Sequence, residues 1–113
     1  MPKISTHVLD LSRGLPAAGI KVQLDHDAGA GYQRVGEGVT DADGRIKTFT
    51  SSHVASTAGR YRLTFILAPY FGMHGVPCFF PEASVTFDVR DPADPHHVPL
   101  LLSPFGYSTY RGS

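Results

Sequence analysis

The sequence predicts an all-β protein, an antiparallel two-sheet β-sandwich of Greek-key type with about eight short strands and one short helix. Apolar and polar residues alternate with a period of two, which is typical of strands with one buried face. Clusters of Gly, Pro and Asp separate these runs and indicate turns. The length suits one domain, so residues 1–113 are expected to form a single core.

Eight segments have a strand pattern. In the three clearest runs every second side chain is aliphatic or aromatic, at residues 20–25, 60–67 and 84–90. Five further strand candidates lie at residues 4–10, 32–40, 45–50, 98–103 and 106–111. Turns are expected at residues 14–16, 28–31 and 41–44, and the two prolines of residues 91–95 exclude a strand interior there.

One stretch has a helical signature. Residues 51–59 begin with two serines, which cap helices well, and end on a glycine, as a short helix should. The sequence therefore predicts its one helix between the strands at 45–50 and 60–67.

Charge and cysteine content exclude several function classes. Ten acidic and ten basic residues give a formal net charge of zero, so nothing favours nucleic acid or an anionic membrane as a partner. The single cysteine, Cys78, cannot form an intrachain disulfide, and we expect a reducing, cytoplasmic setting. No apolar run is long enough to span a membrane, and residues 1–7 do not resemble a secretory signal.

The six histidines are the main candidates for chemistry. With a period of two, His7 shares a strand face with Ser5 and Leu9, and His97 opens a later strand. For either histidine alone, an ordinary neutral residue of core or surface is the better interpretation. His26 lies among predicted loop residues, where we expect it to be solvated.

A metal site is not expected. No pair of histidines has the spacing of a zinc site, and the adjacent His96 and His97 must point to opposite faces of a strand.

Arg45 follows the predicted turn at residues 41–44. It is either a solvated charge at the start of a strand or a planar cation set to bind a carbonyl or oxyanion, and both interpretations stay open. No Gly-x-Ser-x-Gly motif or phosphate-binding loop occurs, and Cys78 has no base beside it. If the chain is an enzyme, histidine acid–base chemistry on a bound water is therefore favoured over covalent catalysis.

Polar side chains continue along the last predicted strand to Tyr110, Arg111 and Ser113, which is unusual for a chain end. Alternation would point Tyr110 and Arg111 to opposite faces, so we expect different roles for them. Arg111 then suits a subunit interface as well as a substrate.

Several motifs, spread over nearly the whole chain, point to one enzyme family. They are Ser5–Asp10, Gly14–Ala17, Thr40–Arg45, Phe79–Glu82, His97–Leu102, and Tyr110–Ser113 with the preceding Ser103–Thr109. These motifs resemble those of the 5-hydroxyisourate hydrolases, transthyretin-related enzymes of purine breakdown. The terminal tetrapeptide is the most specific, because transthyretin lacks it.

One segment departs from the family pattern. The family commonly has His-Tyr-His before Val-Pro-Leu, whereas this chain has Pro95-His96-His97. The histidine beside Val98 is retained, so the family's histidine role is carried to His97.

The resemblance implies a transthyretin-like (prealbumin-like) sandwich. Two copies would pair edge to edge and two dimers would form a homotetramer, with active sites in the channel between dimers. The implied reaction is hydrolysis of the lactam bond of 5-hydroxyisourate to 2-oxo-4-hydroxy-4-carboxy-5-ureidoimidazoline, in urate degradation, without cofactor or metal.

The resemblance also implies site residues. The catalytic residues would be His7, Arg45, His97 and Ser113, and the substrate-binding residues would be His7, Arg45, Tyr110, Arg111 and Ser113. Two histidines would activate water and the arginine would stabilise the oxyanion, and which histidine is the base stays open.

Two other functions compete with this one. A transthyretin-like carrier would bind a small aromatic ligand in the same channel without chemistry, and an adhesion or scaffold sandwich would need no polar cluster at all. Neither needs His7, Arg45, His97 and the terminal tetrapeptide together.

Overall fold

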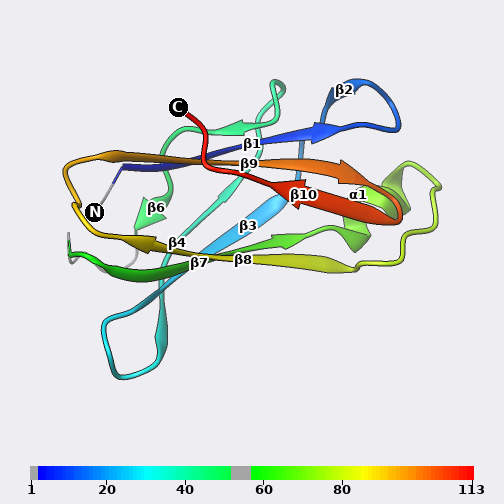
Figure 1. The fold of residues 1–113 in the computed structure, drawn as a ribbon. Coiled ribbons are helices and arrows are strands. Elements are labelled where there is room, and N and C mark those ends of the chain that lie inside the picture. Colours follow the sequence, from blue (N-terminus) through cyan, green and yellow to red (C-terminus); the bar gives the residue numbers. More distant parts are fainter. Residues whose placement is uncertain (1–2, 52–56) are drawn as a thin grey trace.

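The computed structural model describes residues 3–51 and 57–113, and within them the chain forms two five-stranded sheets packed face to face (Figure 1). The elements are β1 (Lys3–Asp10), β2 (Leu15–Pro16), β3 (Lys21–Asp27), β4 (Tyr32–Val39), β5 (Arg45–Ile46), β6 (Thr50–Ser51), β7 (Gly59–Ile66), α1 (Ala68–Met73), β8 (Glu82–Val89), β9 (Pro95–Ser103) and β10 (Gly106–Thr109). The predicted all-β, two-sheet sandwich is confirmed.

The first sheet has β1 at its centre, in the order β10-β9-β1-β2, with β5 also paired to β1. β1 is parallel to β9 and antiparallel to β2 and β5, so the prediction of an antiparallel sandwich is wrong for the β1–β9 pair. Because β9 and β5 lie on opposite sides of β1, side chains from three strands meet on the outer face of this sheet. After β10 the chain continues antiparallel to β9, where Gly112 pairs with His97, and Figure 1 shows the red tail running past β9 to the C-terminus.

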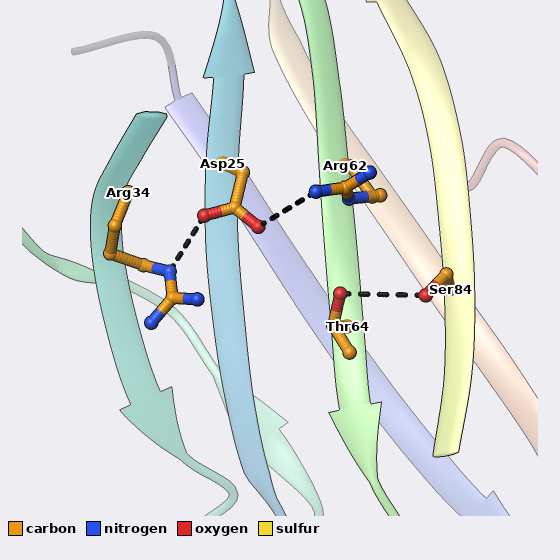
Figure 2. Close-up of polar contacts among 5 residues, drawn as sticks. All are labelled: Asp25, Arg34, Arg62, Thr64 and Ser84. Carbon is orange, nitrogen blue, oxygen red and sulfur yellow. Dashed lines mark hydrogen bonds and ion pairs between the residues drawn. The ribbon is translucent and has the colours of Figure 1, made fainter. Parts of the chain in front are cut away.

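The second sheet, β6-β4-β3-β7-β8, is antiparallel throughout and has a polar outer face. Figure 2 shows Asp25 of β3 between two arginines: Arg34 Nε lies 2.6 Å and Arg62 Nη2 3.5 Å from its carboxylate oxygens. On the neighbouring strand pair, the hydroxyls of Thr64 and Ser84 lie 3.5 Å apart. The carboxylate is almost buried, so the two cations offset its desolvation.

The core lies between the sheets and follows the period of two. On β1, Ile4, Thr6 and Val8 are buried, whereas Ser5 and His7 are only partly covered. Fully burying a Leu, Val or Phe side chain contributes roughly 1.5–3 kcal/mol. The alternation thus fixes the face on which His7 lies, as the sequence predicted.

The helix differs from the prediction. Most of the predicted helix at 51–59 falls on residues 52–56, which lie outside the described residues, while Ser51 belongs to β6 and Gly59 to β7. The observed α1 spans Ala68–Met73 and has proline in its first turn, where proline is tolerated. Burial of Tyr70 and Phe71 stabilises this short segment, and a six-residue helix is too short to show a period in the sequence.

Three smaller expectations also change. Residues 45–50 form two short strands, β5 and β6, instead of one, and residues 15–16, which looked like part of a turn, pair with β1 as β2. His26 is not a solvated loop residue: it lies in β3, is buried, and stacks on Tyr61 with ring centroids 4.2 Å apart. Within the described ranges, no helix has the length and apolar character needed to cross a membrane.

Candidate active site

Strand register brings three of the predicted residues to one place. His7 of β1 is directly opposite Arg45 of β5, and Ser5, two residues earlier on β1, is directly opposite His97 of β9. Residues opposite each other in paired strands project to the same face of the sheet. The side chains of His7, Arg45 and His97 therefore share the outer face of the first sheet.

Arg45 is held by the turn before it. Asp41 Oδ1 accepts hydrogen bonds from the backbone N–H groups of Asp43 at 2.9 Å and Arg45 at 3.0 Å. The bond from the Arg45 N–H is the largest cause that keeps the pKa of Asp41 below its ordinary value. The turn therefore fixes the start of β5, and with it the position of the guanidinium stem.

Gly44 completes this turn and must be glycine. Its φ is +75°, and a Cβ at this position would clash with the carbonyl oxygen of Val8. The close approach allows the Val8 N–H to donate to the Gly44 carbonyl at 2.7 Å, which ties the turn to β1.

His97 is fixed by contacts on two sides. Its Nδ1 shares a hydrogen bond of 2.9 Å with Ser5 Oγ. On the other side, Gly112 donates its N–H to the His97 carbonyl at 2.8 Å and packs against the ring, where a Cβ would come within 2.5 Å of Cδ2. The C-terminal tail is thus ordered because it lies on β9, and it needs glycine at this point.

A pocket of about 330 Å³ opens above these side chains. It is lined by Ser5, Thr6, Arg45, Ile46, Lys47, Pro95, His97 and Ser113. Arg45 and Lys47 make it cationic, so it suits a small, polar, electron-rich molecule. His7 flanks it through its pairing with Arg45.

The pKa of His97 is lowered from its ordinary value of 6.5. Burial is the largest cause, followed by the positive charge of Arg45 and then by His7, since each disfavours the imidazolium. His97 is therefore mainly a neutral imidazole at pH 7, the form that can accept a proton.

Tyr110 and Arg111 lie in a different pocket. This second pocket, of about 250 Å³, lies along β8 and β9 and is also lined by Phe87, Asp88 and His96. β10 ends at Thr109, but Gly112 still pairs with His97 in the register that β10 has with β9. The opposite orientation of Tyr110 and Arg111 remains a prediction, since this pocket is also lined by the adjacent strand residues His96 and His97. His97 borders both pockets.

Of the six predicted site residues, the structure therefore brings His7, Arg45, His97 and Ser113 together, whereas Tyr110 and Arg111 line a second pocket that His97 also borders. Five lining residues of this pocket were not predicted: Ser5, Thr6, Ile46, Lys47 and Pro95. Ser5 had one signal, its place on the same strand face as His7. Among residues 3–51 and 57–113, no three His, Cys, Asp or Glu side chains are grouped so that they could hold a metal ion.

Comparison with known proteins identifies relatives that match nearly the whole chain. A 5-hydroxyisourate hydrolase of Deinococcus radiodurans is 43% identical over 115 residues, covering 99% of this chain and 97% of the relative. The structure of a Klebsiella pneumoniae 5-hydroxyisourate hydrolase superposes with a TM-score of 0.83 at 39% identity, over 98% of this chain and 99% of the other. Sea bream transthyretin in complex with thyroxine gives a TM-score of 0.86 at 31% identity, over 97% and 94% of the two chains.

Fold and site together define a transthyretin-like β-sandwich protein with a polar cluster on the outer face of one sheet. The HIUase/Transthyretin family matches residues 4–112, and the chain belongs to this family. Because its relatives at about 40% identity are 5-hydroxyisourate hydrolases over nearly their whole length, the predicted membership of that group, and the prediction of an enzyme, are confirmed.

Proposed function

We propose that this protein hydrolyses the lactam bond of 5-hydroxyisourate and gives 2-oxo-4-hydroxy-4-carboxy-5-ureidoimidazoline, as a step of urate degradation. One observation carries the proposal: a neutral histidine, an arginine and a second histidine share one face beside a small cationic pocket. Relatives named for this activity, at about 40% identity, support the choice of substrate.

In the proposed mechanism His97 is the general base. Its neutral imidazole takes a proton from a water held between His97 and His7, and the water oxygen bonds to the lactam carbonyl carbon. Arg45 donates hydrogen bonds to the carbonyl oxygen as this becomes an oxyanion. The oxyanion collapses, the C–N bond breaks, and the imidazolium returns its proton to the leaving nitrogen, so that a carboxyl and an N–H remain.

The tail has two proposed roles. Ser113 lines the pocket and would contact the substrate, whereas Gly112 fits against the ring of His97. Tyr110 and Arg111 line the neighbouring pocket, so their predicted contact with substrate remains a prediction. We further propose a cytoplasmic homotetramer in which a second copy covers the open pocket and excludes water.

The carrier alternative is less well supported. A carrier needs no titratable group beside its ligand, and the identity to sea bream transthyretin is 31%, against 43% to the Deinococcus hydrolase.

A coupled assay tests the activity. 5-Hydroxyisourate is generated in place from urate by urate oxidase, and its decay is followed by ultraviolet absorbance with and without the protein. We expect faster decay, and a fall in kcat of roughly 10²–10⁴ in His97→Ala. His74→Ala is the matched control, because His74 is exposed and lies outside both pockets. Spontaneous decay at an unchanged rate, with folded protein present, would reject the proposal.

A further inference from the structure

We propose that Ser5 is a positioning residue for His97: its hydroxyl accepts the Nδ1–H of the imidazole and so presents the unprotonated Nε2 to the pocket. The inference rests on the function proposed for this site, because it explains how His97 would be ready to accept a proton.

Strand pairing fixes the geometry of the contact. Ser5 and His97 are register partners in the parallel pair of β1 and β9, and both side chains lie on the outer face. Ser5 Oγ is 2.9 Å from His97 Nδ1, a good hydrogen-bond distance. A serine side chain in a strand has a single rotatable bond to its oxygen, so the partner of Nδ1 is placed precisely.

The other side of the ring is closed by the tail. Gly112 lies so near to Cδ2 that the ring cannot swing toward it, and Pro99 lies beside the same glycine. With Ser5 at Nδ1 and Gly112 at Cδ2, the ring plane is held in one orientation.

Nε2 is the ring nitrogen left for the substrate side. Among the described residues, Nε2 of His97 has no hydrogen-bond partner. Every buried side-chain nitrogen or oxygen of the described residues does have a partner. Nε2 must therefore be accessible, and His97 lines the pocket that also contains Arg45 and Ser113.

The chemistry selects one tautomer. A neutral imidazole has one protonated and one unprotonated nitrogen, and the hydrogen bond at one nitrogen decides the state of the other. If Nδ1–H donates to Ser5, Nε2 carries the lone pair and can take a proton from water. After that transfer Nδ1–H still donates to Ser5, so nothing has to rearrange during the reaction.

Nuclear magnetic resonance tests this without substrate. In ¹⁵N-labelled wild-type protein above the pKa of His97, with signals assigned by comparison with His97→Ala, we expect a protonated Nδ1 and an unprotonated Nε2. Ser5→Ala should shift His97 toward the Nε2–H tautomer, and Ser5→Thr, which keeps a hydroxyl, should retain the wild-type state. An Nε2–H tautomer in the wild type, or an unchanged tautomer in Ser5→Ala, would overturn the proposal.

Kinetics give the second readout. In Ser5→Ala we expect kcat for 5-hydroxyisourate to fall about tenfold or more while KM stays within about twofold, with recovery in Ser5→Thr. Unchanged kcat in a folded Ser5→Ala would overturn the role. Wild-type protein that has the expected tautomer but no hydrolase activity would reject the proposed function alone.

Discussion

Gly112 packs against the imidazole of His97 so closely that a Cβ on Gly112 would lie 2.5 Å from Cδ2 and 3.2 Å from Cγ. Neither the backbone conformation nor a turn requires glycine at this position, since its φ is not positive. The glycine of the C-terminal motif is therefore required by the ring of a candidate catalytic residue.

This contact makes Gly112→Ala informative. The added methyl must displace either the ring of His97 or the tail, so we expect kcat to fall about tenfold or more with little loss of thermal stability. Gly106→Ala is the matched control, because a Cβ there would meet only Ser103 Oγ at 3.8 Å. Equal activity of the two variants in the absorbance assay would contradict the close packing.

The titration of His97 supplies a second prediction. Burial, Arg45 and His7 all lower its pKa, so the base form should persist below pH 6.5 and be lost only as the pH falls through the lowered pKa. Arg45→Gln removes one of these causes and should raise the pKa part of the way back, leaving the effect of burial. Titration of the His97 ring signals by NMR measures the pKa of His97 in the wild type and in Arg45→Gln. A pKa that is unchanged or lower in Arg45→Gln would contradict this account.

The sequence predicts the parts of the site that lie close together along the chain, but not the contacts between residues that are far apart in it. The period of two on β1 correctly placed His7 and Ser5 opposite the buried Ile4 and Val8. It could not show that Ser5 meets His97, 92 residues later, because parallel pairing of β1 with β9 is a tertiary event.

The tail shows the same limit. The strand pattern of residues 106–111 suggested alternating roles for Tyr110 and Arg111, but β10 ends at Thr109. Beyond that point Gly112 pairs with His97 in the register of β10, so the opposite orientation of the two side chains stays a prediction. The partner of Gly112 is what no local pattern encodes, because His97 lies on another strand. The helix was missed for a related reason: α1 depends on the burial of Tyr70 and Phe71.

On the opposite sheet, Asp25 and its two arginines predict a stability effect. The side chain of Asp25 is 9% exposed, so Asp25→Ala leaves Arg34 and Arg62 without this carboxylate, and we expect a loss of roughly 1–3 kcal/mol in the free energy of unfolding. Urea denaturation measures the loss. Activity should be retained, since this face lies on the other sheet.

Asp88→Ala, which removes an exposed ion pair, is the control for Asp25→Ala. Asp88 pairs with Arg60 at 3.0 Å, but both side chains are 58% exposed, so solvent screens the pair and little measurable change is expected. If Asp88→Ala were as destabilising as Asp25→Ala, burial would not be the reason for the effect.

Gly44 predicts a coupled loss of stability and activity. Alanine at φ +75° is strained by about 1–2 kcal/mol in any protein, and here its Cβ would also clash with the Val8 carbonyl and crowd Pro16 at 3.1 Å. We expect Gly44→Ala to lose roughly 3 kcal/mol or more of unfolding free energy, and to lose activity as Arg45 moves with the turn. Gly14→Ala separates the two causes, since Gly14 has a φ of +66° but open space around a Cβ. Gly14→Ala should show only the smaller loss of stability from backbone strain in thermal unfolding, and it should keep its kcat. If Gly14→Ala lost as much stability as Gly44→Ala, backbone strain alone would explain the need for glycine at position 44, and the close approach of the turn to β1 would not.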